Sequence, residues 1–471
     1  MPKTLAQKIW DLHTVTELEG GATLLYIDRV FLHERTGSIA LKGLEAAGRS
    51  VREPGQVFCT MDHIVDTFPG RGDDTRMPGG RDFIVTTREA ARAAGIRLFD
   101  IGDPDQGIVH VVSPEQGIAL PGTTLVCPDS HTGTVGALGA LAWGIGSTEA
   151  EHAMATKTLA VNRPKQMRVR FEGRLGFGVT AKDMILALIG RHTAAGGVGY
   201  IVEFDGQAVR ELEMEARFTL CNMAVEFGAF SGIIAPDEKT FAYVEDRRFA
   251  PRGAHWEAAM AHWRTLASDE DAEFDRELVI DAAAIAPQVT WGTSPQHEIG
   301  VDGRIPDPAS ESEGNRRKAM ERALDYMGLE AGAPLAGTPI DAAFIGSCTN
   351  SRLSDLRAAA AVLKGRRVAE GVKAICVPGS SRVKAAAEAE GLDRVFIEAG
   401  FEWRESGCSM CFFAGGESFG RQERVITSTN RNFENRQGPG TRSHLASPTT
   451  VAASAVAGRI ADVREYAREG A

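Results

Sequence analysis

Short apolar runs that end in polar turns recur along this chain, and a stretch with helical spacing follows most of them. The segment GTTLVCPDSHT at 122–132 predicts a strand of about five residues that runs into a polar turn. Small residues follow, and the pattern EAEHAMATKTLA at 149–160 predicts a helix. We therefore expect Asp129, Ser130 and His131 to lie at the carboxyl end of a strand.

The same alternation is clearest after residue 315. It predicts strand, helix, strand, helix and strand in turn over residues 340–351, 354–365, 372–381, 383–391 and 394–400. Strands that alternate with helices in this way indicate an α/β fold, a parallel sheet with covering helices. Such sheets bind ligands at the carboxyl ends of their strands. Cys348, Thr349 and Asn350 fall at such an end.

A break in the apolar pattern separates the two halves of this alternation. Residues 303–315, GRIPDPASESEGN, are rich in Pro, Ser and acidic residues, as connecting segments are. The chain shows no internal repeat and no low-complexity run, and its 471 residues are enough for about three domains. We place a domain boundary at the break.

Composition narrows the class of protein. With 43% hydrophobic and 24% charged residues, the chain can bury enough apolar surface to fold as a globular protein. Its 63 acidic residues outnumber the 52 basic ones and give a formal charge of −11, which argues against a general binder of nucleic acid or of anionic membranes. Aromatic residues are sparse at 7% and glycines number 52, a mix more typical of α/β chains than of β-sandwiches.

The sequence also bears on location and redox state. No stretch reaches the roughly 18 uncharged apolar residues of a membrane helix, and the first residues, MPKTLAQKIWDLH, lack the features of a secretion signal. We expect a cytoplasmic protein with no membrane partner. Seven cysteines in such a chain favour free thiols or metal ligands over a disulfide framework.

Three cysteines have the spacing of a metal site. Cys408 and Cys411 form a C-x-x-C pair, and Cys348 lies upstream at a predicted strand end. Four thiolates would close a structural zinc site or an iron-sulfur cluster, whereas three leave one coordination position open for water or substrate. A bare C-x-x-C pair is also compatible with a redox pair or half of a zinc site.

The other four cysteines lie in or beside apolar strings. For Cys59, Cys127, Cys221 and Cys376 the better interpretation is a small buried hydrophobic residue. Cys59 and Cys127 are close in sequence to acidic and histidine residues, so we expect them near a site without ligating anything.

Histidines next to carboxylates are the candidates for proton transfer. A carboxylate in contact with an imidazole fixes its tautomer and raises its basicity, which favours a proton shuttle. Asp62-His63 and Asp129-Ser130-His131 are such groupings, although by sequence alone each is more typical of a turn. His110, in GIVHVV, is by itself more typical of a buried core histidine.

Arginines gather in one glycine- and asparagine-rich stretch, STNRNFENRQGPGTR at 428–442. Guanidinium groups on a loop favour bidentate binding of carboxylates. Arg431, Arg436 and Arg442 therefore predict a small di-acid or tri-acid substrate, with Arg442 the one that best fits a solvated loop.

Together these motifs closely resemble the aconitase family. The resemblance rests on PDSHT at 128–132, FIGSCTNSR at 344–352, GCSMC at 407–411 and STNRNFENRQG at 428–438. More narrowly, LLYIDR at 24–29 and TMDH at 60–63 extend a likeness to the large subunits of isopropylmalate dehydratases over nearly the whole chain.

The resemblance implies a fold and a cofactor. The fold would be three α/β domains of the aconitase type, at 1–164, 165–302 and 303–471, around one 4Fe-4S cluster, without the family's fourth, swivelling domain. The cluster would be held by Cys348, Cys408 and Cys411, with one open iron. The resemblance also implies site residues of two kinds. The acid-base and orienting groups would be Asp62, His63, His110, Asp129, Ser130, His131 and Glu226. The substrate-binding groups would be Asn350, Arg431 and Arg436.

The activity implied is that of a hydro-lyase. It would interconvert 2-isopropylmalate and 3-isopropylmalate by dehydration and rehydration, in leucine biosynthesis. The base that takes the carbon-bound proton would come from the fourth domain, so the resemblance implies a separate small subunit that completes the active site.

Two departures from the family pattern leave the substrate open. Val135 stands where the resemblance leads us to expect a histidine, and residues 412–416, FFAGG, stand where a Leu-x-Met-Asn-like run is expected. The same chemistry on a smaller acid, (R)-2-methylmalate with citraconate or D-malate with maleate, is the nearest alternative. A non-catalytic iron-sensing or RNA-binding relative, and a thiol oxidoreductase that uses Cys408 and Cys411, are alternatives of other classes; the charge of −11 argues against the RNA-binding one.

Overall fold

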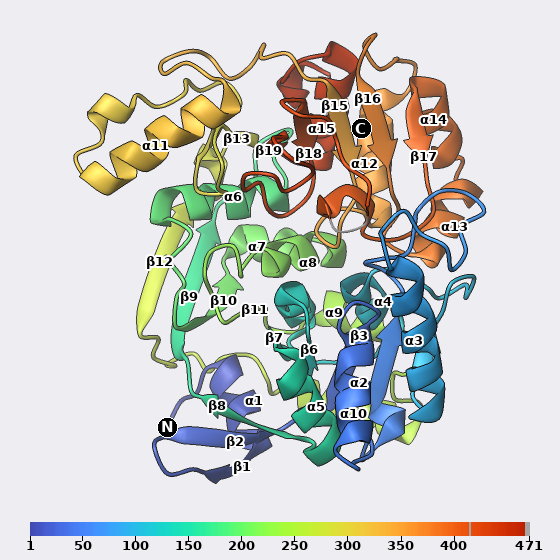
Figure 1. Ribbon diagram of the computed structural model, residues 1–471. Helices are drawn as coiled ribbons and strands as arrows, with labels where there is room; N and C mark the ends of the chain where they lie inside the picture. The colour runs from blue at the N-terminus through green and yellow to red at the C-terminus, as the bar shows by residue number, and fades with distance from the viewer. Residues whose placement is uncertain (414–415, 467–471) are drawn as a thin grey trace.

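Two five-stranded parallel sheets dominate the computed structural model, which describes residues 1–413 and 416–466 (Figure 1). The first has the order β5-β4-β3-β6-β7 and the second the order β17-β16-β15-β18-β19. In both sheets the earliest strand lies in the centre and the chain winds outward first to one side and then to the other. Ligands of such doubly wound sheets bind where the winding reverses, at the strand carboxyl ends. Here the reversal lies between β3 and β6 and between β15 and β18.

The first sheet and its helices are built from residues up to 156. The strands are β3 (Arg29–His33), β4 (Val57–Thr60), β5 (Arg97–Phe99), β6 (Thr124–Cys127) and β7 (Leu141–Gly144). The helices are α1 (Leu5–His13), α2 (Gly37–Ala46), α3 (Gly80–Ala93), α4 (Val109–Glu115) and α5 (Ser147–Thr156), with 3-10 helices η1 (Pro54–Gln56) and η2 (Ser130–Leu138). Every residue of β4 and β6 is buried, as expected for parallel strands covered on both faces.

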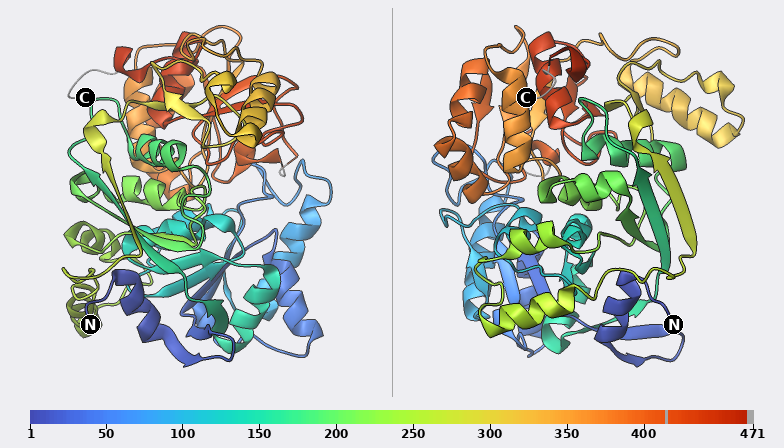
Figure 2. Two further views of the ribbon diagram at one scale, coloured as in Figure 1. Left: turned by 90° about the vertical axis from the view of Figure 1, so that its left-hand side faces the viewer. Right: turned by 180° about the vertical axis from the view of Figure 1, so that it is seen from behind.

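A smaller antiparallel sheet closes the end of the molecule that carries the N-terminus (Figures 1 and 2). It has the order β1-β2-β8, with β1 (Thr14–Glu17), β2 (Ala22–Tyr26) and β8 (Thr158–Asn162). The predicted helix at 149–160 is confirmed as α5 over most of its length, but its last residues form the start of β8.

A four-stranded parallel sheet, β11-β10-β9-β12, follows in sequence. Its strands are β9 (Lys165–Glu172), β10 (Tyr200–Asp205), β11 (Ser231–Ile233) and β12 (Arg276–Asp281). The accompanying helices are α6 (Ala181–His192), α7 (Gln207–Glu211), α8 (Met214–Asn222), α9 (Glu238–Val244), α10 (Ala254–Trp263) and η3 (Ala282–Ala284). One continuous cluster of buried apolar side chains joins this sheet to the first.

The connection to the last sheet contains a hairpin and a projecting helix. These elements are β13 (Gln288–Thr290), β14 (Glu298–Gly300), η4 (Pro308–Ser310) and α11 (Gly314–Met327). Helix α11 projects from the side of the molecule, as Figure 1 and the right-hand view of Figure 2 show. The predicted connecting segment 303–315 is largely irregular, while the division of the chain into three domains stays a prediction.

All three candidate metal-ligating cysteines, Cys348, Cys408 and Cys411, lie on loops of the last sheet. Its strands are β15 (Ala342–Ile345), β16 (Lys373–Cys376), β17 (Phe401–Trp403), β18 (Arg424–Thr427) and β19 (Arg442–Leu445). The helices are α12 (Leu353–Leu363), α13 (Ser381–Ala389), α14 (Leu392–Ala399) and α15 (Pro448–Ala457), with η5 (Ser409–Cys411) and η7 (Val463–Glu465). Its apolar side chains form a second core, distinct from the first.

Four of the five elements predicted after residue 340 are confirmed, and the fifth is wrong. RVFIEAG at 394–400 forms helix α14 rather than a strand, and the strand follows it as β17. Gly391 and Gly400, both with left-handed backbone, bound the helix at its two ends. Phe396 and Ala399 are buried on one face while Ile397 is exposed, a helical period that the short apolar run disguised.

In the described part of the chain, none of the helices combines the length and the apolar character needed to cross a membrane.

Candidate active site

A cavity of about 360 Å³ lies at the carboxyl ends of the two five-stranded sheets. Ten of the residues predicted from the sequence line it: His63, His110, Asp129, Ser130, His131, Cys348, Cys408, Cys411, Arg431 and Arg436. They come from segments more than 300 residues apart, because the ends of β4 and β6 face those of β15 and β18 across the cavity. Asp62 and Glu226 lie directly behind this wall and contact residues on it.

The three cysteines are held on loops with unusual backbone. Cys348 follows β15, and Cys408 and Cys411 flank a 3-10 turn in which the Cys411 amide donates to the Cys408 carbonyl at 3.0 Å. Ser347 and Ser409, each next to a cysteine, have positive φ angles of 85° and 45°. Such conformations are costly for residues other than glycine and persist where the surroundings enforce them.

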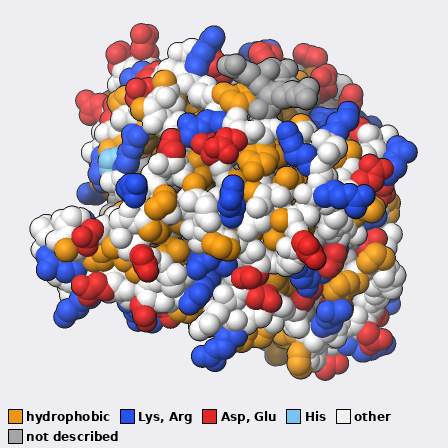
Figure 3. Space-filling model, turned by 90° about the horizontal axis from the view of Figure 1, so that it is seen from above, with side chains coloured by type: hydrophobic (Ala, Val, Ile, Leu, Met, Phe, Trp, Pro, Cys, Tyr) orange, Lys and Arg blue, Asp and Glu red, His pale blue; other side chains and the backbone are white. Residues whose placement is uncertain are grey.

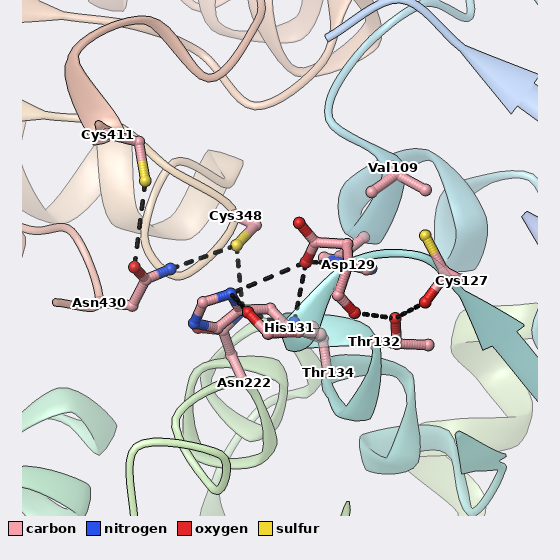
Figure 4. Close-up of polar contacts among 12 residues, drawn as sticks. Val109, Cys127, Asp129, His131, Thr132, Thr134, Asn222, Cys348, Cys411 and Asn430 are labelled. Carbon is pink, nitrogen blue, oxygen red and sulfur yellow. Dashed lines mark hydrogen bonds and ion pairs between the residues drawn. The ribbon is translucent and has the colours of Figure 1, made fainter. Parts of the chain in front are cut away.

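Amide side chains point at the sulfur of Cys348. Asn222 Nδ2 lies 3.2 Å from the Cys348 Sγ and Asn430 Nδ2 lies 3.5 Å from it, on either side of the thiol (Figure 4). Arg436 Nη2 lies 3.7 Å from the Cys411 Sγ. Donors aimed at sulfur stabilise thiolates and the sulfurs of iron-sulfur clusters. This donor set therefore fits a cluster with three cysteine ligands.

The remaining thiols do not line the cavity. The prediction that they are small buried residues is confirmed, whereas Cys59 and Cys127, which we expected near a site, do not reach its wall. Cys59, Cys127, Cys221 and Cys376 are buried among apolar side chains, and burial raises the pKa of each. Among the residues that the structure describes, no fourth cysteine lines the cavity.

His63 is held between two carboxylates. Its Nδ1 lies 2.6 Å from Asp62 Oδ1, and its Nε2 lies 3.3 Å from Asp129 Oδ2. Asp62 Oδ2 in turn accepts the backbone N–H of Val109 at 2.9 Å, which fixes the carboxylate. The ring of His33 stacks on that of His63 at 4.1 Å. The sequence neighbours Asp62 and His63 are thus a contacting pair rather than an ordinary turn.

Asp129 connects three histidines. Its Oδ1 accepts His110 Nε2 at 2.7 Å and the His131 backbone N–H at 2.8 Å, while its Oδ2 faces His63. His110 stands in the first turn of α4 and points into the site, not into the core. The interpretation of His110 by itself as a buried histidine is confirmed, since it is 2% exposed, but it lines the cavity while the neighbouring valines pack into the core.

A second set of hydrogen bonds, beside the set around Asp129, joins His131 to Arg431 through Glu226. His131 Nε2 lies 3.0 Å from Glu226 Oε1, and Arg431 Nε donates to the same oxygen at 2.5 Å. Ser130 Oγ lies 3.3 Å from His131 Nδ1. Glu226 follows α8, so this set of hydrogen bonds links the second sheet region to the first and the last.

The carboxylates of the site are kept ionised and His63 is kept protonated. Burial would raise the pKa of Asp129, but His110, His131 and His63 hold it well below its usual value. Burial likewise opposes ionisation of Asp62 and Glu226, yet their histidine partners lower both pKa values. Burial would lower the pKa of His63, but the charge of Asp62 outweighs it and raises that pKa well above the usual range.

Two arginines from the predicted loop reach the cavity and the third does not. Arg431 and Arg436 line it, and Arg436 Nε is buried without a hydrogen-bond partner among the described residues. Arg442 lies in β19, where its Nε donates to the Tyr326 carbonyl at 2.8 Å. Guanidinium groups on a cavity wall are suited to bind a carboxylate.

Asn350 is not on the cavity wall. Its Nδ2 donates to Thr219 Oγ1 at 3.1 Å and to Asp355 Oδ1 at 3.0 Å, so the side chain points behind the Cys348 loop. The structure thus gives Asn350 a supporting position and does not bring it to the substrate space predicted for it.

The two departures from the family pattern lie in different surroundings. Phe412, the first residue of the run at 412–416, lines the cavity, whereas Val135 is fully buried in η2. Ala414 and Gly415 of that run lie outside the described residues.

Several residues of the site escaped the sequence analysis. Asn430 was inside a quoted motif, but Asn222 carries no sequence signal beyond its nearness to Glu226. His33 ends β3, a central strand, and Glu34 follows it and accepts the Asp62 N–H at 2.9 Å. The rule that strand ends carry sites would have found this pair.

Comparison with known proteins places these residues in a family. The model of the aconitase family (aconitate hydratase) matches residues 7–458. The chain is 56% identical over 466 residues to the 3-isopropylmalate dehydratase large subunit 1 of Bradyrhizobium diazoefficiens, which covers 99% of this chain and 97% of that protein. The crystal structure of Thermococcus kodakaraensis aconitase X in its holo form aligns with 87% of this chain and 84% of its own, with a TM-score of 0.46 and 14% identity. On the family match and the extent of the identity, the chain belongs to the aconitase family.

Proposed function

We propose that this chain is the large subunit of a 3-isopropylmalate dehydratase, which interconverts 2-isopropylmalate and 3-isopropylmalate in leucine biosynthesis. The observation that carries the proposal is one cavity in which three cysteine sulfurs, a histidine and carboxylate network and two arginines meet. The 56% identity over almost the whole chain to a relative of that name supports the same reaction.

The cofactor that fits is one 4Fe-4S cluster on Cys348, Cys408 and Cys411. When bound, such a cluster supplies an iron with an open position that acts as a Lewis acid on a substrate hydroxyl. The amide contacts of Asn222 and Asn430 with Cys348 support this assignment.

The arginines are suited to hold the substrate. A hydroxy di-acid carries two carboxylates, and two arginines, Arg431 and Arg436, line the cavity. Arg431 has its Nε engaged by Glu226, which fixes the guanidinium at the cavity wall. Two fixed guanidinium groups orient a di-acid and so place its reacting carbons against the histidines.

Proton transfer falls to His63. His63 lines the cavity with its Nε2 3.3 Å from Asp129 Oδ2, and its raised pKa favours the protonated ring that a general acid for the departing hydroxide requires. Asp129 and Glu226 orient His110 and His131. We assign the base that takes the carbon-bound proton to a separate small subunit, so the chain is active only in complex with it. A cytoplasmic location also stays a prediction.

The alternatives have less support. RNA binding needs a basic surface, and the described side chains on the face in Figure 3 mix Lys and Arg with Asp and Glu. The alternative of a smaller acid keeps some support, because the bulky ring of Phe412, in the run that departs from the family pattern, stands on the cavity wall and takes up space there.

The test is an anaerobic assay of the chain reconstituted with iron and sulfide. Absorbance of the alkene intermediate is followed with isopropylmalate, (R)-2-methylmalate and D-malate, with and without the small subunit. Turnover of isopropylmalate that requires both chains is the expected result. Turnover confined to a smaller acid would move the enzyme to another substrate, and a complete cluster with no turnover would refute a catalytic role.

A further inference from the structure

Two buried cations lie behind the cysteine loops without a carboxylate in contact. Arg352 and Lys182 are 2% and 0% exposed, and among the described residues neither forms an ion pair. Most buried cations in proteins are paired with an acid, since an unpaired charge away from water is costly. Their presence next to the site therefore calls for a source of negative charge.

Arg352 holds the cluster loop through its backbone. The guanidinium donates to the carbonyl oxygens of Cys348 at 3.0 Å and of Thr349 at 3.2 Å, and its other terminal nitrogen donates to the His110 carbonyl at 3.3 Å. It also lies over the ring of Phe218, at 4.8 Å. One side chain thus ties the Cys348 loop to the helix that carries His110.

Lys182 holds the opposite loop in the same manner. Its Nζ donates to the Ser428 carbonyl at 2.9 Å and also to the Thr429 carbonyl. These two residues immediately precede Asn430, which donates to the Cys348 sulfur. Lys182 is therefore the anchor of the turn that carries Asn430 and Arg431.

Both cations occupy positions that the fold by itself disfavours. Lys182 stands in the first turn of α6, and Arg352 is the N-cap of α12. Helix N-termini carry partial positive charge, which repels cations. Burial also lowers the pKa of Lys182, to about 7. The nearby acids already have donors: Asp355 accepts from Asn350 and from the Arg352 N–H, and Asp183 from Thr180 and Gln288.

The site cysteines add to the negative charge that these cations face. Asp355 and Asp183 act most strongly on Lys182, followed by Cys348 and Cys411, while Arg352 acts on Glu115, Asp355 and Cys348. The guanidinium of Arg352 also contacts the Cys348 carbonyl directly, which places its charge beside the proposed cluster loop. Three thiolates around a cluster give the site a net negative charge that grows on reduction. Resting on the cluster assignment made above, we propose that Arg352 and Lys182 are positioning residues that also supply the counter-charge of the cluster.

The proposal is tested by removing each charge while keeping volume. The variants are R352M and K182M, with R352K as the charge-retaining partner. Matched controls are R424M and K157M: Arg424 and Lys157 are 8% and 2% exposed, donate to the carbonyls of Met327 and Asp28, and lie outside the cavity wall. The cluster is reconstituted anaerobically in the full chain, and its midpoint potential is measured by a redox titration followed by electron paramagnetic resonance.

Loss of a nearby positive charge makes reduction harder. R352M and K182M should shift the midpoint potential to more negative values, lowering the ratio of reduced to oxidised cluster at a fixed potential by about tenfold each. R352K and both controls should keep a potential close to that of the unmodified chain. Thermal unfolding adds a second readout: the gain in stability of the K182M chain on cluster assembly should be smaller than that of the unmodified chain, because the cluster loses a stabilising positive charge.

The outcomes separate the possible failures. Clusters with an unchanged potential in R352M and K182M would refute the counter-charge, leaving these residues only structural. An equal shift in R352K and R352M would show that geometry, not charge, matters. If R352M does not fold, K182M alone tests the proposal, because methionine is nearly isosteric with lysine. If the unmodified chain assembles no cluster under any condition, the cofactor assignment falls and this inference with it.

Discussion

Replacing Asp129 by Asn should separate the charge of this carboxylate from its shape. Asp129 receives hydrogen bonds from His110 and from the His131 backbone at 2.7 and 2.8 Å, and faces His63 Nε2 at 3.3 Å. The amide oxygen can accept the first two bonds. The amide nitrogen then faces His63 and can only donate, so His63 is driven to the neutral form that accepts this bond.

The magnitudes follow from these contacts. A hydrogen bond to a charged group is worth about 1 kcal/mol more than a neutral one, so weakening two of them should cost about 2 kcal/mol. Relief from burying a carboxylate offsets part of that, so we expect the D129N chain to lose no more than about 2 kcal/mol of folding stability. Loss of the proton on His63 removes a general acid, which is worth about 10²–10⁴-fold in kcat.

The assay compares the reconstituted complex carrying D129N with one carrying D105N. Asp105 is a matched control, because it is 7% exposed and pairs with Arg382 and Arg248 but does not line the cavity. Alkene formation gives kcat, urea unfolding gives stability, and the cluster spectrum checks loading. D129N with a full cluster and more than a tenth of the original kcat would refute the role given to Asp129, as would an equal loss in D105N.

Three further outcomes are expected. C348A, C408A and C411A should each lose the visible absorption of the cluster together with activity, whereas C376A should keep both; a cluster that survives in C348A would favour the C-x-x-C oxidoreductase. R436K should raise KM at least tenfold through the loss of a charge-assisted hydrogen bond while the cluster spectrum stays normal, and an unchanged KM would remove Arg436 from substrate binding. Glu203, buried in β10 against Ser268, has its pKa raised by burial to about 7, so the folded chain binds this proton more tightly than the unfolded chain does; stability should therefore fall by on the order of 3 kcal/mol as the pH rises from about 4.5 through about 7. Burial raises the pKa values of Glu34, Glu115 and Glu298 to about 7 as well, so E203Q should reduce the pH slope by the share of one group and leave the rest. Urea titrations at several pH values measure the slope, and a slope in E203Q equal to that of the unmodified chain would refute the assignment to Glu203.

The sequence located most of the site because strand ends and cysteine spacing are local features. The turns after β6 and β15 follow apolar runs that burial requires, so Asp129 and Cys348 were predictable as site residues. The helix α14 was not, since a run of seven residues with few polar positions fits either period.

Contacts between segments far apart in the chain could not be predicted from the sequence, for a different reason. The His131 and Glu226 contact joins residues 95 positions apart, and only the packing of α8 against η2 brings them together. Asn222 reaches Cys348 by the same packing. Asn350 shows the converse, because its place in a motif says nothing of the direction in which the side chain points. Motifs thus name the candidates, and tertiary packing decides which of them face the substrate.

The distance along the chain between the two halves of the cavity also bears on how the protein matures. Residues near 62 and 129 must meet residues near 348, 408 and 436, and closing loops of that size is slow and entropically demanding. The three proposed cluster cysteines all lie on the last sheet, but the Asp62 carbonyl accepts the Cys408 N–H at 2.8 Å and Asn222 reaches Cys348 from α8. The complete site therefore forms only after these parts have packed together, which makes cofactor loading a late event. Cluster assembly would therefore occur only on correctly folded chains, because misfolded copies would offer no complete binding site for iron and sulfide.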